Sequence, residues 1–117
     1  MHNFRKLEVY TRSRVFAREI YLLTARVRRP EHRSVTTQLR NSALGISATI
    51  AEGCGKSSRA ETIRFLEMAS GSTAESEHHL GMASDLAILP ERTCAELTDE
   101  AVQLRRMIRA LITNFPR

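Results

Sequence analysis

The sequence predicts an all-α protein, an antiparallel up-down-up-down four-helix bundle in which residues 1–117 form a single domain. Apolar residues recur at spacings of three and four over most of the chain, which is the period of an α-helix. No alternating Val/Ile/Thr-rich stretch bounded by turn residues is present, so strands are not expected. The breaks between the helical stretches are short, which favours consecutive helices that lie side by side and antiparallel.

The first helix is expected over residues 7–27, because apolar residues recur on one face of this stretch. It should end before the Arg28-Arg29-Pro30 turn, since the residue before a proline avoids the helical conformation. The apolar face consists of Phe16, Ile20, Leu23 and Val27.

The second helix is expected from Ser34, a plausible N-cap, to Gly53. Its apolar residues are surrounded by Gly, Ala, Ser and Thr, so another helix backbone can approach this surface closely. Gly53 and Gly55 can adopt the left-handed conformation that ends a helix. The apolar residues are Leu39, Ala43, Ile46 and Ile50.

The last two helices each follow a Ser/Thr-x-x-Glu capping box, at Ser58 and at Thr93. The third should extend to residues 86–89, ahead of Pro90, and its Gly71 should permit close packing on the second helix. Hydroxyl-rich neighbours predict hydrogen bonds in that contact. The fourth carries a heptad seam of Leu97, Ala101, Leu104, Ile108, Leu111 and Phe115.

The composition predicts an aliphatic core, because aromatic residues make up 5% of the chain and tryptophan is absent. A thin core of this kind often gains burial when the protein forms homo-oligomers. Cys54 and Cys94 are the only cysteines, and neither a secretory signal nor a membrane-length apolar run is present. A cytoplasmic protein with free thiols and no membrane contact is therefore expected.

The charge is unevenly distributed along the chain. Residues 1–59 hold 12 Lys or Arg against 4 acids, whereas residues 60–117 hold 6 against 9. A basic half suggests a polyanion partner, or self-assembly of basic surface on acidic surface. The 16 arginines against 2 lysines suit phosphate contacts, although a GC-rich genome gives the same bias.

Candidate nucleic-acid-binding residues come from this basic half, and a merely solvated basic surface is the alternative. Arg14 and Arg18 additionally share a helix face, being four residues apart. Aromatic residues for base stacking are scarce, with Phe4 and Tyr10 the nearby candidates. The nucleic-acid-binding candidates are Arg5, Lys6, Arg12, Arg26, Arg28, Arg29, Arg33, Arg40, Lys56 and Arg59.

Three further sequence patterns are candidates for catalysis or metal binding, and none of them supports either function. Glu75-x-x-His78 has the spacing of a di-iron ligand pair, but neither His2 nor His32 supplies a second pair, so no metal is expected. The loop before residue 58 lacks the first glycine of a Walker motif, because position 50 is Ile50.

Glu52 is the remaining candidate, because a carboxylate near a helix C-terminus opposes the helix dipole. A structural ion pair with Arg40 or Arg64 is favoured over a general base, since no nucleophile is recognisable nearby. No catalytic residue and no cofactor are predicted, and the protein is not expected to be an enzyme.

The chain resembles the bacterial four-helix-bundle family named for proteins encoded in intervening sequences of 23S ribosomal RNA genes. The resemblance rests on segments 4–10, 38–40, 50–53, 55–56 and 64–66, with Ala69, Gly71-Ser72 and Glu75, in the family's order. It implies a homopentamer, and similarity to accessory proteins of diversity-generating retroelements that engage nucleic acid. No catalytic residue comes with it. The residues of its structural motif are Gln38, Arg40, Glu52, Gly53, Gly71 and Glu75.

These observations together predict a non-enzymatic, oligomeric helical bundle that binds RNA or DNA through an arginine-rich surface. The alternative is a structural protein–protein module in which the basic half of one subunit meets the acidic half of the next.

Overall fold

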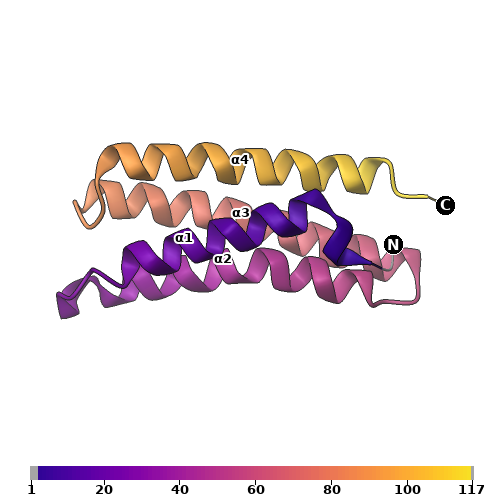
Figure 1. Ribbon diagram of the computed structural model, residues 1–117, viewed down its shortest axis with the longest axis horizontal. Helices are drawn as coiled ribbons and strands as arrows, with labels where there is room; N and C mark the ends of the chain where they lie inside the picture. The colour runs from indigo at the N-terminus through magenta and orange to yellow at the C-terminus, as the bar shows by residue number, and fades with distance from the viewer. Residues whose placement is uncertain (1–2, 117) are drawn as a thin grey trace.

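The computed structural model describes residues 3–116 and contains four long helices and two 3-10 turns. Consecutive helices run in opposite directions, so the up-down-up-down prediction is confirmed (Figure 1). The bundle measures 48 × 21 × 20 Å, and no strand occurs in residues 3–116. The elements are η1 (Phe4–Lys6), α1 (Glu8–Thr24), η2 (Pro30–His32), α2 (Arg33–Cys54), α3 (Arg59–Asp85) and α4 (Glu91–Thr113).

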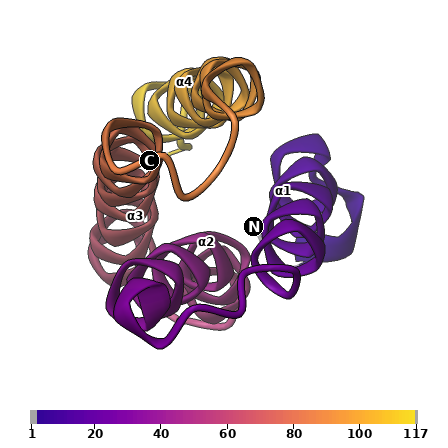
Figure 2. The ribbon, with the colours of Figure 1, turned by 90° about the vertical axis from the view of Figure 1, so that its left-hand side faces the viewer.

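The four helices surround one core, in the order α1, α2, α3 and α4 around the bundle axis (Figure 2). Burial follows the predicted stripes: Phe16 and Ile20 are buried, and so are the first four residues of the heptad seam. Leu23, Val27, Leu111 and Phe115 are only half-buried, because they lie at or just beyond the C-terminal ends of α1 and α4. The core is mainly aliphatic, as the composition predicts, with Phe16 and Phe65 as its buried aromatic residues.

Two predicted N-caps, Ser34 and Thr93, are wrong, although the second helix does begin near Ser34, and a proline precedes each real start. Pro30 begins a 3-10 turn, after which α2 starts at Arg33, so Ser34 lies inside the helix. Pro90 itself occupies the N-cap position of α4 in an extended conformation, which places Thr93 inside that helix. The Ser58 cap is confirmed, because its Oγ accepts a hydrogen bond from the Glu61 backbone N–H at 3.1 Å.

Two helix ends also differ from prediction. Helix α1 ends at Thr24, whose hydroxyl donates to the Ile20 carbonyl at 2.7 Å, and residues up to Val27 continue as a tighter turn. Helix α2 continues one residue past Gly53, to Cys54. No described glycine has a positive φ, so the left-handed stop expected at Gly53 or Gly55 is wrong; the helix ends through a right-handed turn instead.

The close contact between α2 and α3 is confirmed, but the glycine assigned to it is wrong. A Cβ added at Gly45 would lie 3.2 Å from Ser72 Oγ, and one at Gly53 would lie 2.9 Å from Phe65 Cβ. The Ser76 and Ser42 hydroxyls are hydrogen-bonded across the contact at 3.0 Å. Gly71 instead faces solvent, since it stands two residues before the buried Thr73 and so on another side of α3.

Candidate nucleic-acid interface

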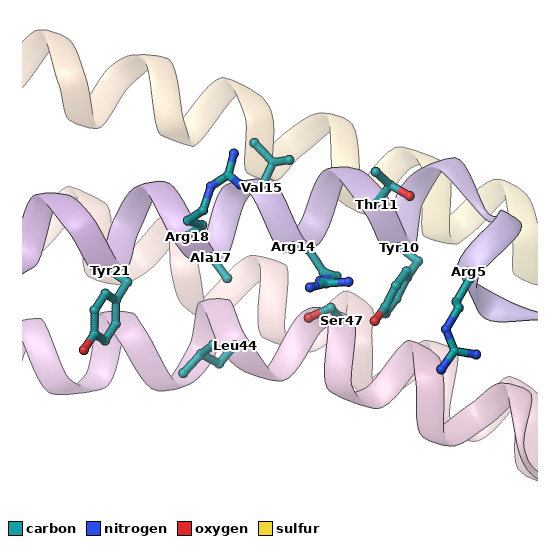
Figure 3. A pocket seen from close by; sticks show the side chains of 10 residues that line it. All are labelled: Arg5, Tyr10, Thr11, Arg14, Val15, Ala17, Arg18, Tyr21, Leu44 and Ser47. Carbon is teal, nitrogen blue, oxygen red and sulfur yellow. The ribbon is translucent and has the colours of Figure 1, made fainter.

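A shallow groove of about 710 Å³ runs between α1 and α2 on the basic side of the bundle (Figure 3). Its lining combines three arginines, two tyrosines and small or apolar residues, and no carboxylate of residues 3–116 lines it. Most of these residues come from α1, with Leu44 and Ser47 contributed by α2. The lining residues are Arg5, Tyr10, Thr11, Arg14, Val15, Ala17, Arg18, Tyr21, Leu44 and Ser47.

The spacing of the residues on α1 explains why they share this groove. Tyr10, Arg14, Arg18 and Tyr21 follow one another at intervals of four, four and three residues, which keeps them on one face of a helix. The two tyrosines are 11 residues apart, so they lie about 17 Å apart along the helix axis. The arginines therefore stand between two aromatic rings.

The arginines of the groove are free of carboxylate partners among residues 3–116. Arg5, Arg14 and Arg18 are exposed, and none forms a salt bridge to a described residue. Arg5 lies over the Phe4 ring at 4.7 Å, and Arg14 lies 5.8 Å from the Tyr10 ring. Phe4 and Tyr10 pack edge to face with ring centroids 4.8 Å apart. These contacts orient the cations and leave their charge uncompensated.

Tyr21 closes the groove at the end nearest the α1–α2 turn. Its residue surface is 54% exposed, and the Arg40 guanidinium carbon lies 4.7 Å from the centre of its ring. Arg40 Nε donates to Thr24 Oγ1 at 2.6 Å, and Thr24 is only 2% exposed. A residue of α2 is thereby held against an aromatic ring of α1. Tyr21 is not among the residues predicted from sequence, although its i+3 spacing from Arg18 indicates the shared face.

The predicted basic residues do not form one patch. Arg26, Arg28, Arg29 and Arg33 surround the α1–α2 connection, whereas Lys56 and Arg59 lie at the α2–α3 connection, at the opposite end of the bundle (Figure 1). Arg29 pairs with Glu31 at 2.7 Å, so part of the first group is neutralised. Only Arg5 of the ten candidates lines the groove, with Arg40 behind Tyr21.

The remaining candidates make contacts of other kinds. Arg12 faces α4, where its guanidinium donates two hydrogen bonds to Glu100 at 2.6 and 3.1 Å. The hydrogen bond to Glu100 raises the pKa of Arg12. Lys56 Nζ lies 4.8 Å from the Phe65 ring. Arg59 donates to the Pro116 carbonyl at 3.1 Å, and Lys6 is exposed beside the N-terminal turn.

The ion pair predicted for Glu52 is wrong. Glu52 is exposed and makes no salt bridge to a residue that the structure describes. Arg40 lies 12 residues away, which is about 18 Å along the helix, and it is held by Thr24. Arg64 stacks on the Phe65 ring at 4.9 Å instead.

The other singled-out residues show no assembled chemical site. Gln38 and Glu75 are exposed, and the His78 and His79 rings lie 5.2 Å apart without completing a set of three metal-ligating groups in the described chain. His2 lies outside the described residues. Both cysteines are buried and unpaired, and burial raises the pKa of each thiol.

The opposite side of α1 carries the contrasting charge. A groove of about 260 Å³ between α1 and α4 is lined by Glu19, Glu96 and Glu100 together with apolar residues. On α4, Arg92, Arg105 and Arg109 are each paired with a glutamate of α3 or α4. Of the 12 cations of residues 1–59, Arg12 and Arg29 alone are paired with a carboxylate of residues 3–116. Most of the positive charge without a described carboxylate partner therefore lies on α1, α2 and the turns that flank them, with Arg64 and Arg106 as the exceptions on α3 and α4.

The helices found in residues 3–116 include none with both the length and the hydropathy that a membrane span requires.

Three comparisons place the chain among known proteins. A protein-family model described as "23S rRNA-intervening sequence protein" matches residues 5–110. The fold is similar to the crystal structure of a protein of unknown function from the S23 ribosomal protein family of Bacteroides thetaiotaomicron. That match has a TM-score of 0.83 and 21% sequence identity, and it covers 91% of this chain and 99% of the other. No curated protein matches the sequence.

Proposed function

We propose, from the premise that this chain belongs to the 23S rRNA-intervening sequence protein family, that it is a non-enzymatic, oligomeric bundle that binds RNA or DNA. The observation that carries the proposal is the α1–α2 groove, in which Arg5, Arg14 and Arg18 lack carboxylate partners among the described residues. Guanidinium groups bind phosphate oxygens in a bidentate manner, so such a groove suits a nucleic-acid backbone.

Binding of this kind works by charge neutralisation. Each phosphate that an arginine neutralises releases counterions, so the affinity falls as salt rises. Three arginines per subunit predict a log–log salt slope of about −2 for a single strand. A symmetric oligomer repeats the groove, and several weak contacts to one strand then add up to a much higher avidity. The homopentamer that the family resemblance implies would present five such grooves.

The first test removes charge from the groove. The double variant Arg14→Gln/Arg18→Gln should weaken RNA binding about tenfold or more and flatten the salt slope, because two phosphate contacts are lost. Arg92→Gln/Arg106→Gln on α4 is the matched control, with the same change in net charge but outside the groove. Filter binding across a salt series measures both.

Equal losses in the two double variants would show that only overall charge matters, and the groove would then have no special role. Affinity that is absent at low salt, or that does not change with salt, would refute nucleic-acid binding altogether.

A structural protein–protein module is the second candidate, and two contrasting surfaces favour it. The basic α1–α2 groove and the acidic α1–α4 groove have opposite charge, so the two can face each other between subunits. Val15, Leu22 and Leu44 are exposed on α1 and α2, which gives such a contact an apolar component. In this function the arginines serve assembly instead of a nucleic acid.

We further propose that the protein catalyses no reaction and that it is cytoplasmic. Glu52, the one carboxylate considered as a base, is exposed and has no described cation partner. The raised thiol pKa of the buried cysteines disfavours nucleophilic chemistry at Cys54 and Cys94. Free thiols persist in a reducing compartment. Turnover of any substrate that Glu52→Gln abolishes would contradict this part of the proposal.

A further inference from the structure

The Tyr21 ring lies at the edge of the basic groove, and one of its faces is in contact with another side chain. The Arg40 guanidinium covers one side of the ring at 4.7 Å, while 54% of the residue surface remains exposed. A tyrosine at this degree of exposure keeps ring surface in water, where a flat aromatic partner can stack on it. Figure 3 shows the ring and Arg14 on the side of α1 that faces α2, whereas the Arg18 side chain, which also lines the groove, extends toward Val15.

The support behind the ring is fixed by the fold. Arg40 Nε donates to Thr24 Oγ1 at 2.6 Å, and Thr24 is itself anchored by donating to the Ile20 carbonyl at 2.7 Å. Because Thr24 is 2% exposed and Arg40 is half-buried, this hydrogen bond is partly shielded from water and restrains Arg40. The loss of side-chain conformational entropy is then smaller when a partner stacks on Tyr21.

The spacing of aromatic and cationic residues along the groove also suits an extended single strand of nucleic acid. Tyr10 and Tyr21 stand about 17 Å apart along α1, with Arg14 and Arg18 between them. Cations between aromatic rings match the alternation of phosphates and bases in a single strand. A duplex keeps the faces of its bases stacked inside the helix, so only unpaired bases can reach Tyr21.

We propose that Tyr21, backed by Arg40, is a stacking platform for an unpaired base, so that the α1–α2 groove takes single-stranded nucleic acid in preference to duplex. This inference rests on the proposed function and names its substrate class. The arginines supply affinity for any polyanion, and the tyrosine distinguishes strands with accessible bases.

The composition of the chain allows a direct measurement. Tryptophan is absent and there are two tyrosines, so the Tyr10→Phe variant has Tyr21 as its only tyrosine emitter. This variant is titrated at low salt with a single-stranded oligonucleotide, its duplex, and inorganic polyphosphate. The single strand should quench Tyr21 fluorescence, whereas polyphosphate should bind without quenching. Binding itself is followed independently by displacement of a labelled oligonucleotide.

Substitution of the platform completes the test. Tyr21→Leu should weaken single-strand binding roughly 5- to 100-fold and leave polyphosphate binding unchanged, because stacking is lost and charge is retained. Tyr21→Phe should restore single-strand binding, since the ring is kept. Circular dichroism and sedimentation verify that each variant keeps the fold and assembly of the parent.

The outcomes separate this inference from the proposed function. Equal binding of duplex and single strand without quenching would overturn the stacking platform and leave phosphate binding standing. If no polyanion binds, both proposals fail. If Tyr21→Leu instead dissociates the oligomer, the groove is an interface between copies of the chain, and the stacking proposal is overturned.

Discussion

At the scale of single residues, Gly53 shows how little space separates α2 from α3. Thr62 Oγ1 donates to the Gly53 carbonyl at 3.0 Å, and Phe65 packs directly against the Gly53 Cα. The glycine is needed for this approach and not for a special backbone angle, since it lies within a regular helix. Gly71 is the contrasting case, because its position is open.

Gly53→Ala should therefore destabilise the protein by about 1–2 kcal/mol, because the new Cβ would lie 2.9 Å from Phe65 Cβ. Gly71→Ala is the matched control and should stabilise it by about 0.5–1 kcal/mol, since it adds helix propensity without a clash. Urea denaturation measures both free energies of unfolding. A neutral or stabilising Gly53→Ala would show that α2 and α3 have room to separate.

His79 provides a residue-scale prediction for pH. Burial lowers the pKa of His79, the charge of His78 lowers it further, and Glu75 partly opposes both. The unfolded chain then binds the proton more readily than the folded chain, so the free energy of unfolding falls as pH drops through about 6.5. His79→Gln should flatten this dependence, whereas His78→Gln, at an exposed site, should flatten it less. Denaturant titrations between neutral and mildly acidic pH test the difference, and an unchanged pH slope in His79→Gln would refute the assignment.

At the scale of elements, the end of α3 depends on a residue in an unfavourable conformation. Ala87 has a φ of 55°, in the left-handed region that usually takes glycine. The turn is closed by hydrogen bonds from the Ala87 and Ile88 N–H groups to the carbonyls of Ser84 and Ala83. This pattern is a Schellman motif, which reverses the chain and leads into α4 through Pro90.

Ala87→Gly should consequently stabilise the bundle by about 0.5–1 kcal/mol, because glycine adopts positive φ without the steric cost that Cβ imposes. Ala74→Gly in the exposed interior of α3 is the control and should cost about 1 kcal/mol. Thermal unfolding of the two variants gives opposite shifts in Tm if this holds. Two shifts in the same direction would contradict it.

At the scale of the whole molecule, positive and negative charge occupy different sides of one bundle. The α1–α2 side holds the groove with unpaired arginines, and the α1–α4 side holds Glu19, Glu96 and Glu100. Pairs such as Arg105–Glu77 and Arg109–Glu67 neutralise cations on α4 by using carboxylates of α3. Because these ion pairs neutralise cations of α4, positive charge is concentrated on the α1–α2 side. This charge distribution supports both the nucleic-acid function and the assembly function.

Sedimentation at rising salt should distinguish these two functions. We expect the proposed oligomer to persist from low to high salt, because exposed apolar residues outside the groove, Leu22, Met68, Met82 and Leu86, can give an interface whose strength does not depend on charge. The arginines of the groove are then free to bind phosphate. Dissociation as salt rises would instead show that basic and acidic surfaces hold the subunits together. The Arg92→Gln/Arg106→Gln variant controls for effects of net charge.

The sequence by itself determined the helices, their buried faces and the charge imbalance. Periodicity fixes which side of a helix is apolar, and the Ser58 cap and the heptad seam of α4 are local patterns of this kind. The N-caps of α2 and α4 were expected two and three residues too late, at Ser34 and Thr93, because the nearby prolines start these segments earlier. These features depend only on residues that are close together in the sequence.

Only the tertiary structure decided which side chains meet. Long cationic side chains reach several neighbours, so sequence spacing did not reveal that Arg12 pairs with Glu100 on α4 or that Arg40 crosses to Thr24 on α1. The same holds for Gly45 and Gly53, which face α3 where Gly71 had been expected to face α2. The period of the sequence determines which face of each helix is apolar. The rotation and separation of the helices are fixed only when the whole core packs, and they determine which residues line the groove.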